Sequence, residues 1–96
     1  MNVNIQIPSV LRRHTGGKGQ LTVVAANLSE LVDRLGDVYP DLKHHLRDEA
    51  GQLRRFINFY VNDEDIRFLG NHSYHFQEGD EVLIVPSISG GTAESG

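Results

Sequence analysis

A single long amphipathic pattern lies in the middle of this chain of 96 residues. Apolar side chains recur there at the spacing of one helix face: Leu28, Leu31, Val32, Leu35 and Tyr39. Asn27, followed three residues later by Glu30, resembles a capping box, in which two side chains bond free backbone N–H groups at a helix start. The sequence therefore predicts an amphipathic helix over residues 28–39, whose apolar face has to pack against another element.

Proline marks the expected end of this helix. Pro40 disfavours helical geometry at the residue before it, so we expect the chain to break at Tyr39. Proline is also accepted in the first turn of a helix, and Leu42 and Leu46 then share one face. We expect a short second helix to begin at Pro40, followed by a loop over residues 48–52.

Two strand patterns precede the helix. Residues 2–7 alternate strictly between polar and apolar side chains, which is typical of a strand with one buried face. Alternation returns over residues 21–25, where Leu21, Val23 and Ala25 fall on one side. A glycine-rich loop at residues 14–19 lies between the two patterns, so the sequence predicts a hairpin.

Further strand patterns follow the helices. The expected elements are a strand over residues 53–61, a turn over residues 62–65, a short strand over residues 66–68 and a last strand over residues 82–85. The last run is apolar at every position, as in a strand buried at the centre of a sheet, and Pro86 ends it.

This order of elements predicts one α+β domain without internal repeats. A mixed sheet of four to five strands should carry one main helix across a face, with a short second helix beside it. We expect side chains of both layers to be largely buried, namely Val3, Ile5, Leu31, Val32, Leu35, Ile57, Phe59, Val82 and Ile84.

Charge and composition exclude several classes of function. Cysteine is absent, which excludes disulfides, thiolate metal sites and a cysteine nucleophile. The net charge of −4 argues against a general binder of phosphate backbones. The charge is also unevenly distributed, since residues 1–55 carry eight bases and six acids, whereas residues 56–96 carry one base and seven acids. We find neither a secretory signal nor an apolar run long enough to span a membrane, and expect a cytoplasmic protein.

No pattern indicates catalysis or a resident metal. A zinc site built on His44 and His45, or on His72 and His75, needs at least a third ligand, and no cysteine can supply it. The Gly-Gly-Lys-Gly run at residues 16–19 lacks the earlier glycine and the following Ser or Thr of a phosphate-binding loop. We therefore expect no catalytic residue, no bound cofactor and no metal in this chain.

The most informative segment is residues 78–91. A glycine–aspartate turn leads into the last apolar strand, the strand ends at a proline, and a short tail runs to Gly90 and Gly91. In this order of elements the sequence resembles the MoaD/ThiS family of ubiquitin-like sulfur carriers, which have the β-grasp fold. Within that family it is most similar to a carrier protein of cysteine biosynthesis, in residues 11–17, 55–58, 60–68 and 78–91.

The resemblance implies a folded domain, residues 1–86, followed by a flexible tail, residues 87–96. A partner adenylyltransferase/sulfurtransferase of the MoeB/ThiF type would use ATP to adenylate the carboxylate of Gly91, and a sulfur donor would convert it to a thiocarboxylate. Gly90 and Gly91 would thread a narrow channel of that enzyme, because glycine has no Cβ. The sulfur would then pass to a cysteine-synthase-like acceptor enzyme, while thiamine, molybdenum cofactor, tRNA thiolation and a secondary metabolite stay open as other destinations.

Residues 92–96 depart from the family pattern, in which the active form ends at the second glycine. With Thr92 attached, Gly91 is held in an amide and has no free carboxylate. The resemblance implies a precursor that a JAMM-type zinc metallopeptidase cuts between Gly91 and Thr92. The alternative is an untrimmed chain that acts as an inactive binding module.

Two other functions remain open. A ubiquitin-like modifier would be conjugated to target lysines through Gly91, whereas a plain β-grasp interaction domain would carry no such chemistry. In each case we expect a monomer whose partners are proteins, with neither nucleic acid nor membrane bound.

The residues expected to face a partner are Phe56, Tyr60, Asp63, Glu64 and Asp65, although either aromatic ring could equally lie in the core.

Overall fold

The computed structural model describes residues 1–86 of the chain. Its strands are β1 (Asn2–Gln6), β2 (Gln20–Val24), β3 (Ile57–Val61), β4 (Glu64–Asp65) and β5 (Glu81–Pro86). Its α-helices are α1 (Leu28–Val38) and α2 (Pro40–Leu46), and its short 3-10 helices are η1 (Ser9–His14), η2 (Ile66–Leu69) and η3 (Asn71–Ser73). None of the helices in this described range is long and apolar enough to cross a membrane.

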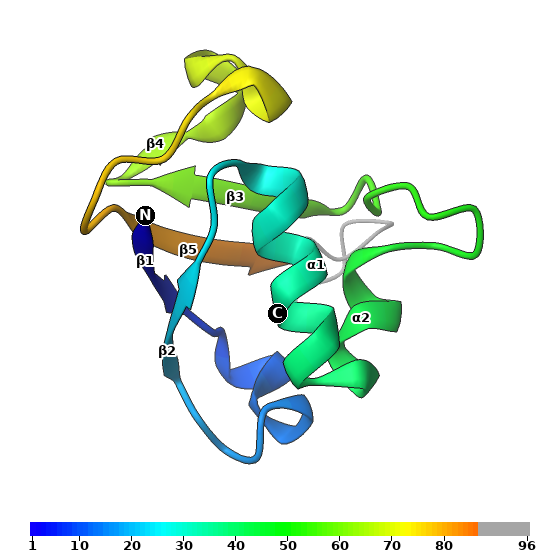
Figure 1. The fold of residues 1–96 in the computed structure, drawn as a ribbon. Coiled ribbons are helices and arrows are strands. Elements are labelled where there is room, and N and C mark those ends of the chain that lie inside the picture. The colour runs from blue at the N-terminus through cyan, green and yellow to red at the C-terminus, as the bar shows by residue number, and fades with distance from the viewer. Residues whose placement is uncertain (87–96) are drawn as a thin grey trace.

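The strands form one mixed sheet in the order β2-β1-β5-β3-β4. β1 pairs with β2 in antiparallel and with β5 in parallel, and β3 pairs with β5 in antiparallel. The first and last strands are therefore adjacent and parallel, as the β-grasp resemblance implied. Both α-helices lie on the same side of this sheet, with α1 crossing it (Figure 1).

The core lies between α1 and the sheet face that it covers. All nine side chains predicted to be buried are buried, and Leu31 and Leu35 are fully enclosed. Every second residue of β3 and β5 points inward, so Phe59 and Ile84 pack beneath the helix. The helical stripe and the strand alternation thus supply the two sides of one core, as predicted.

Local signals set the ends of the helices. The side-chain oxygen of Asn27 accepts a hydrogen bond from the backbone N–H of Glu30 at 3.0 Å, and the Glu30 carboxylate accepts one from the backbone N–H of Ala26 at 2.9 Å. This is the predicted capping arrangement, with the return bond one residue earlier than usual. The chain leaves the helical conformation at Tyr39, and Pro40 begins α2.

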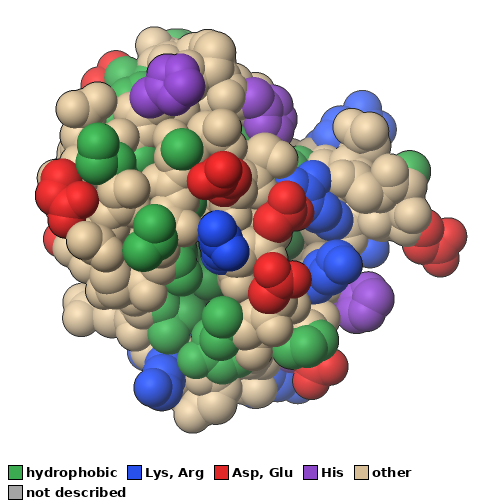
Figure 2. Space-filling model, in the orientation of Figure 1, with side chains coloured by type: hydrophobic (Ala, Val, Ile, Leu, Met, Phe, Trp, Pro, Cys, Tyr) green, Lys and Arg blue, Asp and Glu red, His purple; other side chains and the backbone are tan. Residues whose placement is uncertain are grey.

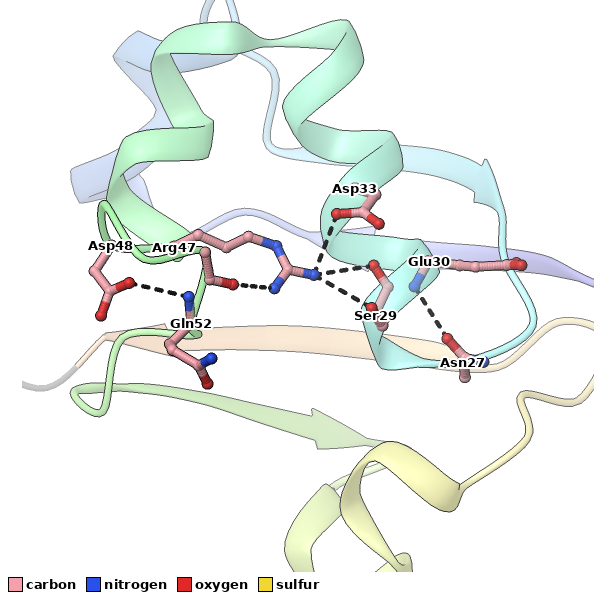
Figure 3. A network of polar contacts seen from close by, with 8 residues as sticks. Asn27, Ser29, Glu30, Asp33, Arg47, Asp48 and Gln52 are labelled. Carbon is pink, nitrogen blue, oxygen red and sulfur yellow. Dashed lines mark hydrogen bonds and ion pairs between the residues drawn. The ribbon is translucent and has the colours of Figure 1, made fainter.

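The segment after α2 is tied to α1 by the side chain of Arg47 (Figure 3). One guanidinium nitrogen lies 3.2 Å from the carboxylate of Asp33 and donates to Ser29, while the other donates to the backbone oxygen of Gly51 at 2.7 Å. These contacts hold the loop that leads into β3. The strand itself begins only at Ile57, so the prediction of a strand from residue 53 was too long at its start.

The predicted turn at residues 62–65 and strand at residues 66–68 were partly wrong. The turn consists of Asn62 and Asp63 alone, both with positive φ, and Glu64–Asp65 forms the short strand β4. Residues 66–69 then form η2 instead of a strand. The cause is local, because the Asp65 carboxylate accepts a hydrogen bond from the backbone N–H of Arg67 at 2.9 Å and so caps a helical turn.

Candidate functional site

The residues predicted to carry the chemistry, Gly90, Gly91 and Thr92, lie outside the described residues. The structure places the residue from which their segment continues. Pro86 is the last residue of β5, and it pairs with Ile57 at the start of β3. The tail therefore leaves from the middle strand of the sheet, beside the first residue of β3.

The strand that leads into the tail, β5, also contributes to the sheet face opposite the helices (Figure 1). Leu83 stands at its centre, paired with Gln6 on β1 and with Tyr60 on β3, and 39% of its surface is exposed. Val85 and Asn58 form the next pair toward Pro86, and both are half-buried. We call Tyr60, Leu83 and Val85 the open-face patch. It is an apolar surface, two of whose residues lie on the strand that ends at Pro86.

Polar side chains surround the open-face patch. Asn4 accepts a hydrogen bond from the Thr22 hydroxyl at 3.0 Å across the β1–β2 pair. A shallow hollow of about 330 Å³ lies between the patch and the β3–β4 turn, lined in part by Gln6, Asn62 and Glu81. An apolar centre with a polar rim is typical of a protein-docking surface.

Both predicted aromatic residues lie outside the core. Tyr60 is half-buried on the open face beside Leu83, and Phe56, 40% exposed, directly precedes the pair of Ile57 and Pro86. Phe56 therefore lies next to the point where the tail begins, whereas Tyr60 lies nearer the other end of β3, beside Leu83. Burial in the core, the other possibility for either ring, is excluded.

The predicted acidic cluster separates into two parts. Asp63 and Glu64 are exposed at the β3–β4 turn. Asp65 is 6% exposed, and its carboxylate forms an ion pair of 2.7 Å with Arg67. Hydrogen bonds from the Arg67 side chain and backbone lower the pKa of Asp65. Its negative charge is already paired, so Asp65 does not belong to an acidic docking surface.

A second carboxylate, Asp80, fixes the position of this turn. It accepts hydrogen bonds from the Tyr74 hydroxyl at 2.7 Å, the Asn62 side chain at 3.0 Å and the backbone N–H of Gln77 at 2.9 Å. Burial, together with the bond to Asp80, raises the pKa of Tyr74 to about 12. Asn62 also exchanges two bonds with the backbone of Glu81, at 2.8 and 3.0 Å, which ties the turn to the start of β5.

The sequence prediction missed two exposed apolar residues, Leu83 and Phe68. Phe68 is 80% exposed on η2. Leu83 was part of a run expected to be buried on both faces, yet only Val82 and Ile84 point into the core. A usable signal was present, since one main helix covers one face of a sheet and alternate residues of a central strand then reach the other face.

The described part of the chain offers a surface for binding rather than a set of reacting groups. Within residues 1–86, no three histidine or carboxylate side chains are grouped so that they could hold a metal ion. Among these residues, the carboxylates and the tyrosine with shifted pKa values, Asp65, Tyr74, Glu78 and Asp80, all have hydrogen-bond partners within the fold. The arrangement can present the open-face patch and the tail to another protein together.

Comparison with known proteins gives a consistent result. The model of the ThiS family matches residues 5–91. The sulfur carrier protein CysO of Mycobacterium tuberculosis (strain H37Rv) is 40% identical over 93 residues, which cover 95% of this chain and all of the relative.

Two solved structures show the same fold. One is the Amycolatopsis orientalis BexX/CysO complex, in which the matching chain is 39% identical with a TM-score of 0.80, covering 93% of this chain and 99% of the other. The other is small archaeal modifier protein 1 of Methanosarcina acetivorans, 26% identical with a TM-score of 0.84, covering 94% and 96%.

Proposed function

The chain belongs to the ThiS family, and we propose that it is a sulfur carrier, a protein cosubstrate of its partner enzymes rather than an enzyme. The observation that carries this proposal is the 40% identity to a sulfur carrier protein across the whole of that relative. The family match also ends at Gly91, the residue at which we propose that sulfur is attached. Chemistry at Gly91 and docking through the open-face patch are the two parts of this function.

Activation is needed because a carboxylate is a poor electrophile. The free carboxylate of Gly91 attacks the α-phosphorus of ATP, which releases pyrophosphate and leaves an acyl-adenylate. A sulfide donor then attacks the acyl carbon, AMP departs, and the carbonyl carbon carries a thiocarboxylate. The partner adenylyltransferase of the MoeB/ThiF type supplies the ATP site and the catalytic groups. Gly90 and Gly91 fit through its narrow channel because glycine has no side chain.

Docking positions the tail for this reaction. The open-face patch meets the activating enzyme while the tail enters its channel. The similar CysO chain of Amycolatopsis orientalis was solved in complex with BexX, which supports a partner protein for carriers of this kind. An apolar centre around Leu83 would contribute affinity, and the exposed carboxylates of Asp63 and Glu64 would act mainly on the association rate.

Trimming precedes activation in this proposal. While Thr92 is attached, the Gly91 carbonyl belongs to an amide and has no oxygen able to attack ATP. A JAMM-type zinc metallopeptidase hydrolyses the bond between Gly91 and Thr92 and so creates the free carboxylate. The thiocarboxylate then donates sulfur in biosynthesis, most directly to a cysteine-synthase-like acceptor, since the similar relative is CysO.

A second candidate function is that of a protein modifier conjugated through Gly91 to target lysines. The observation that favours it is the similarity in fold and sequence to small archaeal modifier protein 1. Both candidates need the same trimmed and adenylated terminus. They differ in whether the acyl carbon is attacked by a sulfur donor or by a lysine amine.

The test compares the full chain with a chain that ends at Gly91. Each is incubated with the cognate activating enzyme, ATP and sulfide, and the intact mass is measured. We expect the mass increase for replacement of one oxygen by sulfur only in the shorter chain. A matched control ends at Gly91 but carries Gly90→Val, which should fold normally and react slowly. Sulfur incorporation at Gly96 of the full chain would refute the proposal.

A further inference from the structure

The strand β2 forms one outer edge of the sheet in the described part of the chain. It contains no charged residue and no proline, and its five residues pair with β1 in an unbroken register. The opposite outer edge, β4, has only two residues, and both are acidic. Charges, prolines and shortness are the usual features that keep an edge strand from pairing with another chain. β4 has such protection, whereas β2 has none.

The backbone hydrogen bonds show which residues of β2 face outward. The N–H of Ile7 donates to the carbonyl of Gly19 at 2.8 Å, just before β2 begins. Bonded positions alternate with non-bonded ones along an antiparallel pair, so Gln20, Thr22 and Val24 direct their N–H and C=O groups away from β1. All three residues are exposed, and no other backbone group of residues 1–86 bonds to them. The edge is therefore open to a further strand.

The side of this edge that faces the helices is apolar. Leu21 and Val23 pair with Ile5 and Val3 of β1, whose side chains are fully buried, so both lie on the core side of the sheet. They pack against the core but are only partly buried. Figure 2 shows hydrophobic side chains gathered along the border between β2 and α1. A strand added to β2 would extend the core over these side chains.

We propose that two copies of this chain join through the outer edges of β2 and form a symmetric dimer with one continuous sheet. The outward backbone groups belong to even-numbered residues, so the bonded pairs of an antiparallel arrangement join even to even. The register that pairs all five residues places Thr22 opposite Thr22 of the second copy, on the two-fold axis. Gln20 of each copy then bonds Val24 of the other.

The side chains in this register favour a second copy as the occupant. Leu21 of each copy lies opposite Val23 of the other, at non-bonded positions where side chains approach closely, so the half-buried apolar border is covered twice. Lys18, two residues before β2, lies opposite Ala26 of the second copy. The N–H of Ala26 donates to the Glu30 carboxylate at 2.9 Å, so opposite charges meet at both ends of the interface.

The dimer is independent of the proposed sulfur-carrier function. The open-face patch lies on β3 and β5, and the tail continues from β5, whereas the dimer uses only the β2 edge of the sheet. A dimer differs from the monomer expected in the sequence analysis, because the order of the strands, and with it the open edge, becomes visible only in the fold.

The first test is sedimentation equilibrium of the full chain at micromolar to millimolar concentrations, where we expect a reversible monomer–dimer equilibrium. Thr22→Lys places two like charges at the axis and should raise the dissociation constant roughly tenfold or more. Gln52→Lys is the matched control, with the same charge change at an exposed position before β3. Circular dichroism verifies the fold of each variant. A chain that stays monomeric throughout, as expected if this edge serves another protein, overturns the proposal, as does a dimer unaffected by Thr22→Lys.

Cross-linking locates the axis, because the chain has no cysteine of its own. A short bismaleimide should join Thr22→Cys into a covalent dimer, whereas Glu64→Cys, exposed on β4, should stay monomeric. A mixture of Gln20→Cys and Val24→Cys chains should cross-link more than either variant alone. Equal cross-linking of Glu64→Cys, or of each single variant and the mixture, overturns the proposed register and edge.

Discussion

The imidazole rings of His14 and His45 lie with their centroids 4.1 Å apart, tilted by 34° to each other, where η1 packs against α2. Burial lowers the pKa of His45, and the neighbouring positive groups of His14, Arg13, Arg54 and His44 lower it further. A proton is therefore bound less readily by His45 in the folded chain than in the unfolded chain, whose ordinary pKa is 6.5.

The first prediction concerns stability on mild acidification. Protonation of His45 below pH 6.5 favours the unfolded chain, because the pKa of His45 is lower in the folded state. The free energy of unfolding is therefore highest, as far as this group is concerned, above pH 6.5 and decreases as the pH falls below that value. His45→Gln should therefore flatten the pH dependence of the unfolding midpoint between about pH 7.5 and about pH 5. Urea titrations at several pH values measure this. His75→Gln, an exposed histidine outside the contact, is the control, and equal slopes in all three proteins would contradict the prediction.

Stability in stronger acid should depend on different groups. Hydrogen bonds lower the pKa of Asp65 and Glu78, so these carboxylates favour the folded state above their ordinary pKa values and lose that contribution as the pH falls further. On acidification, the loss of stability due to His45 occurs at a higher pH than the loss due to these two carboxylates. Asp65→Asn should leave the step near pH 6.5 in place.

The second prediction concerns the core beneath α1. Leu31 is fully buried against the sheet, so Leu31→Ala removes packed methyl groups and leaves a cavity. We expect a loss of about 2–5 kcal/mol in the free energy of unfolding. Val38→Ala, on the exposed side of the same helix, should change it by no more than about 0.5 kcal/mol. Chemical denaturation of both variants provides the comparison, and similar losses would show that Leu31 is not in the core.

The third prediction concerns docking of the open-face patch. Leu83→Glu places a charge at the centre of the patch, and the domain should still fold because Leu83 is partly exposed. In adenylation assays with the Gly91-ending chain, we expect KM for the carrier to rise about tenfold or more, as for a central interface residue. Val38→Glu, an exposed apolar residue on the helical side, should leave KM unchanged. An unaltered KM for Leu83→Glu would exclude this face.

The fourth prediction separates the three acidic residues near the β3–β4 turn. Reversing the exposed charges of Asp63 and Glu64 should slow association with the activating enzyme roughly two- to tenfold at low salt, with a smaller effect at high salt. Stopped-flow measurements report this rate. Asp65→Asn should instead lower the stability of the fold, because it weakens the bidentate contact with Arg67. Electrostatic steering is refuted if the double reversal leaves the low-salt rate unchanged.

Local signals explain which parts of the fold could be predicted from sequence. The helix over residues 28–38 has its cap, its apolar stripe and its proline stop within a short stretch, so its prediction was confirmed almost to the residue. The pairing of β1 with β5 joins distant segments, and no periodicity reveals it. That relationship came from the family resemblance.

The errors also have local causes. Residues 66–68 alternate as a strand does, but three residues form too short a pattern to outweigh a carboxylate that caps a helical turn. Leu83 stands in a fully apolar run, in which inward and outward positions look alike. The contact between Arg47 and Asp33 could not be predicted either, since it joins two segments that only the folded chain brings together.

The central place of β5 has a mechanical consequence. In the proposed function, a partner that draws the tail into a channel would pull β5 from Pro86, where β3 pairs with it, while β1 pairs with the earlier residues Glu81–Leu83. The hydrogen bonds to the two neighbours then share the load in shear, instead of opening one at a time as they do when an edge strand is peeled away. In the proposed function, the domain would act as an anchor under this tension, and the tail available to the partner would begin after Pro86.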